Sequence, residues 1–323
     1  MFWLFLVLFA DQFDSAFRAG LIALNEGNLA AAESQLEAAA RLQPQDARVW
    51  LALARTYWKS HKLEKAQPAA RNAEAFAADA SVLKGLSVYY SESAAYGKAA
   101  DLLQAAIARN PYEAGYYFDR AQLLFRQEKF AEALETLDAG RKQFDRSAQL
   151  ELAAGVAYYG LRRVPEAIDA FLRTIQLDPS VEQPYMFLGR VVDQAEDRVP
   201  KIRDVFAALV QREPDNYLSN YLYGKSLAME DPARAEALLR KSIAAKGQFW
   251  ESHFALGVLL ESKGKLEQAA SEMRRSAELN PGDPAAHYRL AHLYDRLGNA
   301  SQARAERELH AKLAARSPAA AIK

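Results

Sequence analysis

The five histidines are the first residues to consider for chemistry, because an imidazole can act as a general base or as a metal ligand. They are His61, His253, His287, His292 and His310. His287 and His292 are five residues apart, which misses the four-residue spacing of a metal-binding pair on a helix. His253 and His287 stand at equivalent places of consecutive repeats, which indicates packing. We therefore predict no metal site.

Other patterns of catalysis are also missing from the sequence. There is no phosphate-binding Walker loop, no GxSxG nucleophile elbow and no dinucleotide fingerprint. The chain has no cysteine, which excludes disulfides, thiolate nucleophiles and cysteine-ligated metals. The carboxylates of Glu33, Glu37, Glu267 and Glu272 are expected on solvated outer helix faces. The sequence predicts no enzyme, no cofactor and no small-molecule substrate.

The amino-acid composition indicates that the chain folds, and its charge balance limits the partners that are expected. Half of the 323 residues are apolar and a quarter are charged, so the chain should fold rather than stay disordered. Lys plus Arg and Asp plus Glu both total 41. Because there is no net positive field, a nucleic-acid partner is not expected.

The chain begins with the apolar run MFWLFLVLFA. This run is shorter than the roughly 20 residues of a membrane-spanning helix and falls within the roughly 7 to 15 of a secretory signal core. However, no Lys or Arg precedes Arg18. Residues 1–10 are therefore interpreted as a signal that targets a membrane, as an apolar helix packed on the first repeat through Phe5, Leu8 and Phe9, or as a start that is cut short. The first interpretation favours an exported or envelope-associated location over a cytoplasmic one.

Small residues recur along the chain at intervals of about 34. One series of alanines is Ala32, Ala66, Ala99, Ala133, Ala167, Ala235, Ala269 and Ala303. Ala167 and Ala235 are two intervals apart, and Ile202 stands at the place between them. The second is Gly20, Ala54, Ser87, Ala121, Gly155, Gly189, Gly224, Gly257 and Ala291. The prolines keep the same period at Pro44, Pro111, Pro179, Pro214 and Pro281. Because the two series of small residues and the series of prolines share one period, they indicate tandem repeats.

Within one repeat, the apolar spacing predicts two helices. In YYFDRAQLLFRQEKFAEALETL, Tyr117 and Ala121 share one helical face, and Ala133 and Leu137 share another. Small residues let the two helices approach closely, and bulky residues such as Leu36 and Met273 fill the seam. Proline ends the second helix. The turns between the helices are expected to use left-handed glycines at Gly27, Gly264 and Gly298.

This pattern resembles the tetratricopeptide repeat (TPR) family, most clearly in FALGVLLESKGKLEQAASEMRRSAELNPGD. The resemblance implies an all-α fold, a right-handed superhelical solenoid of tandem helix-turn-helix repeats. We expect an apolar segment over residues 1–12, an array of nine units over 13–316 and a flexible tail over 317–323. The units are expected to start at Phe13, Ala47, Ala80, Ala114, Ala148, Glu182, Tyr217, Trp250 and Pro284.

The resemblance also implies that the first helices line a concave groove through their second, fifth, ninth and twelfth residues. These positions carry rings and basic side chains, and the candidate binding residues are Phe17, Arg48, Arg55, Trp58, Lys84, Phe118, Phe125, Tyr159, Arg190, Tyr221, Lys225, Phe254 and Tyr288. Lys59 and Arg126 follow one position further on. Such side chains suit a segment with apolar and acidic groups. Rings at helical spacing are also common in cores, and a shift of one position would bury several of them.

The sequence therefore predicts a non-enzymatic scaffold that binds a peptide or protein segment in this groove. One alternative is a regulatory or docking part of an enzyme or envelope assembly whose catalytic part lies on another domain or chain. A third interpretation is self-association through the ends of the array. The identity of the partner does not follow from the sequence.

Overall fold

The computed structural model describes residues 2–192 and 199–315, with side chains for residues 11–192 and 200–315. Within these ranges the chain forms 18 helices and no strand. The first helices of the repeats are α1 (Phe2–Asn25), α3 (Ala47–Lys59), α5 (Ala80–Glu92), α7 (Ala114–Phe125), α9 (Ala148–Gly160), α11 (Glu182–Val191), α13 (Tyr217–Leu227), α15 (Trp250–Ser262) and α17 (Pro284–Arg296). The second helices are α2 (Leu29–Leu42), α4 (Leu63–Phe76), α6 (Tyr96–Arg109), α8 (Phe130–Gln143), α10 (Val164–Leu177), α12 (Val199–Arg212), α14 (Pro232–Ala245), α16 (Leu266–Leu279) and α18 (Ala300–Ala314).

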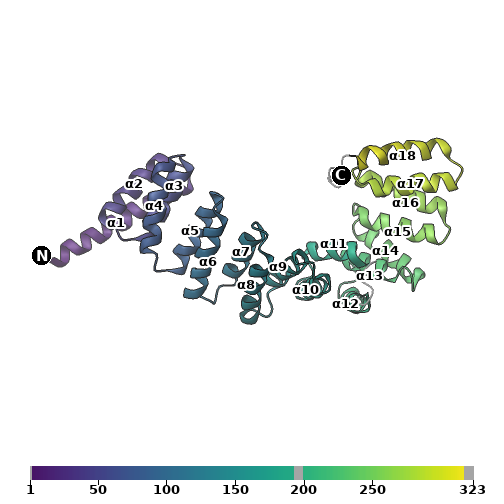
Figure 1. Ribbon diagram of the computed structural model, residues 1–323, viewed down its shortest axis with the longest axis horizontal. Coiled ribbons are helices and arrows are strands. Elements are labelled where there is room, and N and C mark those ends of the chain that lie inside the picture. The colour runs from purple at the N-terminus through teal and green to yellow at the C-terminus, as the bar shows by residue number, and fades with distance from the viewer. Residues whose placement is uncertain (1, 193–198, 316–323) are drawn as a thin grey trace. The chain divides into compact units, whose positions relative to one another are not determined.

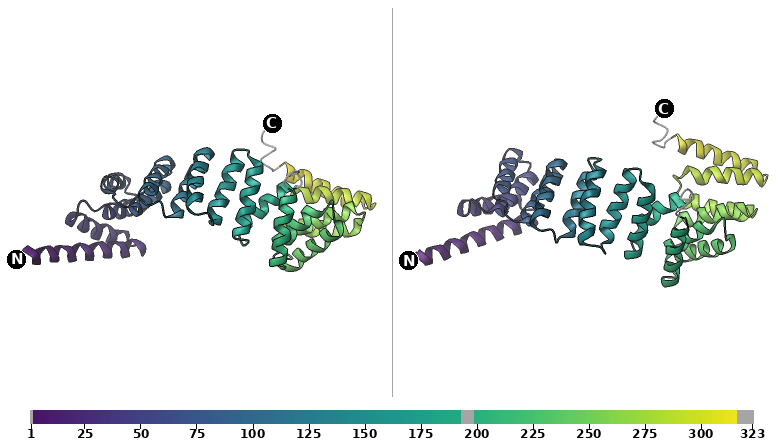
Figure 2. Two further views of the ribbon diagram at one scale, coloured as in Figure 1. Left: turned by 90° about the horizontal axis from the view of Figure 1, so that it is seen from below. Right: turned by 60° about the horizontal axis from the view of Figure 1, so that its bottom comes forward.

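Consecutive helices form antiparallel pairs joined by short turns (Figures 1 and 2). The chain divides into two compact units, Met1–Ala170 (unit 1) and Phe171–Lys323 (unit 2). From α3 onward, every first helix begins at the residue where the sequence analysis starts a repeat. The predicted all-α class and its tandem helix-turn-helix organisation are confirmed.

The first helix is longer than the repeat pattern requires. It begins at Phe2 and continues unbroken through Phe13, so no helix boundary separates residues 1–12 from the first repeat. The expected packing of Phe5, Leu8 and Phe9 lies outside the residues whose side chains the structure describes. No helix in the described ranges combines the length and hydropathy needed to cross a bilayer.

The two helices of each pair meet through small residues, as the sequence predicts. A Cβ added at Gly20 would lie 2.6 Å from Cγ of Leu36, and one added at Gly257 would lie 3.0 Å from Met273. Leu36 and Met273 are both fully buried. The small residue is therefore required by the close approach of the neighbouring seam side chain.

Seven of the turns between paired helices use a single residue with positive φ, whereas the α13–α14 turn has none. Gly27, Gly264 and Gly298 have φ values of 76°, 72° and 77°, which confirms the predicted glycine turns. Four other pairs place non-glycine residues in the same conformation, namely His61, Ala94, Glu128 and Arg162, with φ of 58° to 60°. These four side chains tolerate a left-handed conformation that usually favours glycine.

Junctions between repeats are held by a polar side chain at the fourth residue of the following first helix. This side chain bonds to a backbone carbonyl six residues earlier, in the turn. The pairs are Trp50 with Pro44 (2.7 Å), Tyr117 with Pro111 (3.1 Å), Tyr185 with Pro179 (3.1 Å), Asn220 with Pro214 (2.8 Å) and His253 with Gly247 (3.3 Å). Because four different donor types reach the same carbonyl position, the shared requirement is to satisfy that carbonyl. Leu83, Glu151 and His287 occupy this place without such a bond; Glu151 instead pairs with Arg141 at 2.9 Å, and His287 lies 2.6 Å from Glu306.

Several carboxylates expected to be solvated are bonded to neighbouring elements instead. Glu33 pairs with Lys62 and with Lys65 (3.0 Å), and Glu37 accepts from Tyr57 Oη at 2.8 Å. Glu272 Oε2 lies 2.7 Å from Nδ1 of His253. The expectation of solvated faces was wrong for these carboxylates, because each second helix reaches polar groups of its own or the next repeat.

Glu236 is the most strongly held carboxylate of unit 2. It is the fifth residue of α14, the place that Glu33 occupies in α2, and it is 7% exposed. It pairs with Arg240 and, in the turn between α15 and α16, with Lys263 (2.5 Å) and Lys265 (3.4 Å). The hydrogen bond from Lys263, more than any other contact, lowers the pKa of Glu236 to about 2.

We expect Tyr117→Phe to lower the free energy of unfolding by about 1 kcal/mol, because it removes the bond to the Pro111 carbonyl. Tyr112→Phe is the matched control, since Tyr112 is 74% exposed in the same turn. Equilibrium urea unfolding followed by circular dichroism measures both variants. Equal midpoints for the two variants would show that the junction bond does not stabilise the repeats.

We expect Glu236→Gln to lower the free energy of unfolding by about 1 kcal/mol at neutral pH. A folded pKa below the unfolded value means that the carboxylate stabilises the fold above about pH 4.5 and loses this effect as the pH falls towards about 2. The difference between wild type and variant should therefore shrink over that interval in urea unfolding at stepped pH. Glu267→Gln, at an exposed place on α16, is the control. A difference that stays constant with pH would contradict the assignment.

Candidate functional site

The candidate site is the surface formed by the groove positions, defined as the second, fifth, ninth and twelfth residues of each first helix, counted in α1 from Phe13, the predicted start of the first repeat. Large apolar side chains are exposed at four of them. In unit 1 these are Val88 (37%), Val156 (39%) and Tyr159 (51%), and in unit 2 it is Tyr288 (52%). Exposed apolar side chains on one face of a repeat array are typical of a protein interaction surface.

In unit 1 this surface is hollowed between α5 and α7. The cavity has a volume of about 210 Å³ and is lined by Lys84, Ser87, Val88, Ser91, Glu92, Leu103, Asp119, Gln122, Leu123 and Arg126. On α5, the sixth residue is Gly85, which admits the Leu51 side chain of α3 and lets those two helices pack. On α7, the sixth residue is Asp119, which instead forms an ion pair with Lys84. Between α5 and α7, the ion pair of Lys84 with Asp119 therefore stands beside the cavity, where α3 and α5 have the apolar contact of Leu51 with Gly85.

The predicted binding residues differ in how much of each side chain is available. Exposed are Arg48, Tyr159, Arg190 and Tyr288; half-buried are Phe17, Arg55, Trp58, Lys84, Phe118, Phe125, Lys225 and Phe254; buried is Tyr221. The half-buried rings also pack on neighbours: Trp58 lies edge-on to Tyr89 at 6.0 Å, and Phe17 stacks on Phe13 at 5.8 Å. These rings can offer only part of their surface to a partner.

The prediction that Tyr221 is a binding residue was wrong. It is 6% exposed, and its ring packs edge-on against Phe249 at a centroid distance of 5.2 Å. Gly189 makes room for it, because a Cβ there would lie 3.0 Å from Tyr221 Oη. Tyr221 therefore belongs to the core between α11 and α13 and is closed to a partner.

The sequence analysis missed two exposed groove residues, Val88 and Val156. Both are the ninth residue of a first helix, α5 and α9. The prediction from the sequence included only aromatic and basic side chains at this position. An apolar side chain where the repeat pattern exposes a face is the signal that would have found them.

The basic side chains of the surface fall into paired and unpaired groups. Arg48 is held by Asp46, Lys84 by Asp119, and Lys225 Nζ donates to the Gly189 carbonyl. Burial lowers the pKa of Lys84. Among the described residues, no carboxylate pairs with Arg55, Lys59 or Arg126.

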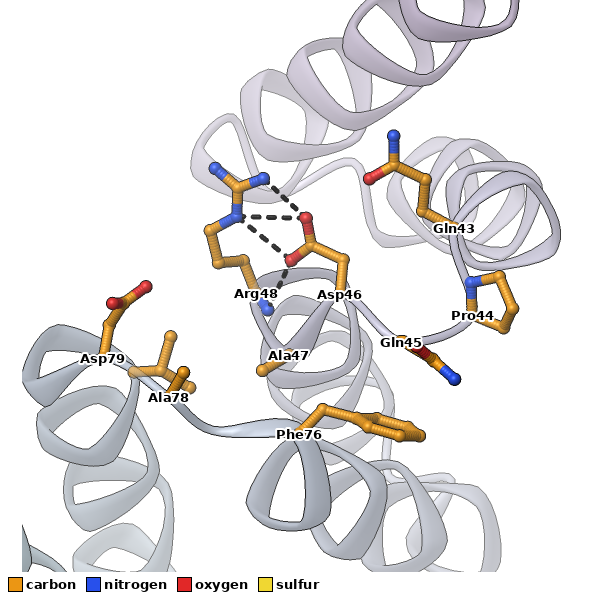
Figure 3. A pocket seen from close by; sticks show the side chains of 10 residues that line it. Gln43, Pro44, Gln45, Asp46, Ala47, Arg48, Phe76, Ala78 and Asp79 are labelled. Carbon is orange, nitrogen blue, oxygen red and sulfur yellow. Dashed lines mark hydrogen bonds and ion pairs between the residues drawn. The ribbon is translucent and has the colours of Figure 1, made fainter. Parts of the chain in front are cut away.

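A second and larger cavity, of about 560 Å³, lies at the edge of unit 1 (Figure 3). It is lined by the α2–α3 turn with Arg48 and Asp46, and by the α4–α5 turn with Phe76 and Asp79. The guanidinium of Arg48 is already bonded to Asp46. The cavity borders the α4–α5 junction, where Leu83 stands at the place of the donor found at five other junctions.

Histidine and acidic groups do not converge on a metal centre in the described part of the chain. His253 pairs with Glu272, and Nδ1 of His287 lies 2.6 Å from Glu306. Both histidines are buried and bonded to the second helix of their own repeat.

Comparison with family models identifies the class of protein. Models described as tetratricopeptide repeat match residues 17–81, 86–137, 118–182, 226–284 and 260–321. The chain belongs to the tetratricopeptide repeat family. No curated protein sequence is similar enough to this chain to count as a relative.

Solved structures agree on the fold. The chain is similar to the C-terminal part of a TPR repeat-containing protein from Cytophaga hutchinsonii, with a TM-score of 0.55 and 14% identity over 84% of this chain and 97% of that one. It is also similar to PilF of Pseudomonas aeruginosa (TM-score 0.46, 20% identity, 69% and 99% coverage). A third similar structure is YrrB, described as a TPR protein with an unusual peptide-binding site (TM-score 0.41, 21% identity, 66% and 93% coverage). The first of these likenesses shows the predicted TPR solenoid fold.

Proposed function

We propose that this protein is a non-enzymatic scaffold that holds a segment of a partner protein against the groove positions of its first helices. The observation that carries the proposal is the exposure of Val88, Val156 and Tyr159 along unit 1. Each belongs to a first helix, α5 or α9, and the cavity between α5 and α7 lies on the same face.

Physical chemistry supports binding at these residues. Covering an exposed apolar side chain contributes roughly 25 cal/mol per Å² of apolar area removed from water. Aromatic side chains such as Tyr159 contribute most when a partner desolvates them, because they bury a large area with little loss of side-chain freedom. Repeat proteins also present such faces on rigid helices, which reduces the entropy cost of binding.

Three of the buried titratable side chains take part in contacts between helices. His253 and His287 bond to carboxylates within their repeats, and Glu236 is tied to three basic side chains. Such fully bonded groups stabilise the stacking of helices. We therefore assign the function to recognition.

We expect Tyr159→Ala to weaken capture of a specific partner at least about tenfold, because it removes the most exposed ring of the unit 1 surface. Quantitative affinity capture from source lysate compares wild type, Tyr159→Ala and Tyr112→Ala. Tyr112 is the matched control, since it is exposed in the α6–α7 turn and lies off the groove positions. All three proteins must show equal helicity. Partners that bind Tyr159→Ala as well as wild type, yet depend on Tyr112, would overturn the proposed surface.

A further inference from the structure

We infer that the cavity between α5 and α7 binds a free α-amino acid whose own side chain is polar and uncharged. The ammonium and carboxylate of this zwitterion would pair with Glu92 and Arg126, and its side chain would bond to the hydroxyl of Ser87. The inference goes beyond the proposed function, because it adds a small-molecule ligand to a protein that we propose to bind a protein segment.

The first argument is a buried hydroxyl that the protein leaves without a bond. Ser87 on α5 is 3% exposed and lines the cavity, and no hydrogen bond joins its hydroxyl to another residue of the described ranges. Buried hydroxyls on other first helices bond within their own helix. Thr56 of α3 donates to the Ala52 carbonyl at 2.8 Å. Ser226 of α13 likewise donates to the Tyr223 carbonyl at 2.8 Å. Because a buried hydroxyl without a partner is costly, a ligand that bonds to Ser87 is favoured.

The second argument is that the sequence of this repeat opens the cavity. In the series of small residues at the seam, Ser87 is the only member with a hydroxyl group, since the others are glycine or alanine. At the twelfth place of α5, Ser91 replaces the ring of the neighbouring first helices. Those rings are Trp58 on α3, Phe125 on α7 and Tyr159 on α9. Helices α5 and α7 also pack less closely than α3 with α5 or α7 with α9. Small polar side chains in place of a ring therefore leave a polar space here.

The third argument is a pair of opposite charges at one end of the cavity. Glu92 is the thirteenth and last residue of α5, and Arg126 stands at the thirteenth place counted along α7. Both side chains are exposed and line the cavity, and neither forms an ion pair with a described residue. Arg126 lies over the Tyr96 ring at 5.4 Å, which leaves the donors in the plane of its guanidinium for a carboxylate. An α-amino acid carries its ammonium and its carboxylate on one carbon, so a single head group can meet both side chains.

The rest of the cavity selects the side chain of the ligand. Lys84 and Asp119 already pair with each other, so a further charge placed beside them would find no free counter-ion. An apolar side chain would cover the hydroxyl of Ser87 without bonding to it. The volume of about 210 Å³ lies below the roughly 300 to 1,000 Å³ of sites for drug-sized molecules, which favours a small ligand. Glutamine, asparagine and serine meet these requirements.

Isothermal titration calorimetry of the full chain with free glutamine, asparagine and serine tests the inference. We expect at least one of them to bind with a dissociation constant of about 1 mM or below, and leucine and glutamate to bind at least about tenfold more weakly. Ser87→Ala should weaken binding at least about fivefold. This variant should fold, because Ala54 and Ala121 hold the same place in the neighbouring repeats. Ser34→Ala, which removes an exposed hydroxyl of α2 outside the cavity, should leave the affinity unchanged.

Two analogues of the tightest-binding amino acid test the charged contacts one at a time. Its N-acetyl derivative lacks the ammonium, and its carboxamide derivative lacks the carboxylate. Each analogue should bind the wild-type chain at least about tenfold more weakly. Glu92→Gln should weaken binding of the free amino acid and abolish the further loss on acetylation. Arg126→Gln should abolish the further loss on amidation in the same way, because a contact that is already missing cannot be lost again.

Three results would overturn the inference. If none of the three amino acids binds at concentrations up to about 10 mM, the cavity does not hold this class of ligand. If leucine binds as tightly as they do, the selection of a polar side chain is wrong. If binding is unchanged by Ser87→Ala, Glu92→Gln and Arg126→Gln, the ligand lies elsewhere on the chain. The effect of Tyr159→Ala on partner capture is measured without the amino acid, so the proposed function is tested separately.

Discussion

Where glycine stands at the seam, the two helices of a repeat approach so closely that an added Cβ would collide with the side chain opposite. At Gly20 the collision would be with Leu36, and at Gly257 with Met273. This closeness joins each pair along one seam and directs the remaining apolar faces towards the neighbouring repeats. Because a single pair cannot bury those faces alone, stability comes from stacking.

The stacking of repeats in turn determines which partners the polar side chains bond to. The turn between repeats brings a backbone carbonyl near the next first helix, and Trp50, Tyr117, Tyr185 and Asn220 each donate to it. Second helices meet the next turn, where Glu33 and Glu236 bind lysines. First helices keep one face that is partly open to solvent, and in unit 1 that face carries the exposed side chains of Val88, Val156 and Tyr159. The candidate binding surface is thus what remains after packing has used the other faces.

The repeat organisation was predictable because it depends on residue size at a fixed period. The starts of α3 to α17 and the three glycine turns follow from that period alone. The turns at Ala94 and Glu128 were not predictable, since neither residue type favours a positive φ. Burial of Tyr221 depends on Gly189 of another repeat, which local spacing does not reveal. The free or paired state of each cation likewise depends on contacts between repeats, as the ion pair of Lys84 with Asp119 illustrates.

The central claim is that partners bind the first helices of unit 1 and not its second helices. Site-specific photocrosslinking tests this most directly, with benzoylphenylalanine placed at Val88 on α5 or at exposed Gln104 on α6. If partners bind the first helices, position 88 should give a covalent adduct with one partner segment, and position 104 should give no adduct with that segment. An adduct from position 104 alone, or equally from both, would contradict the claim.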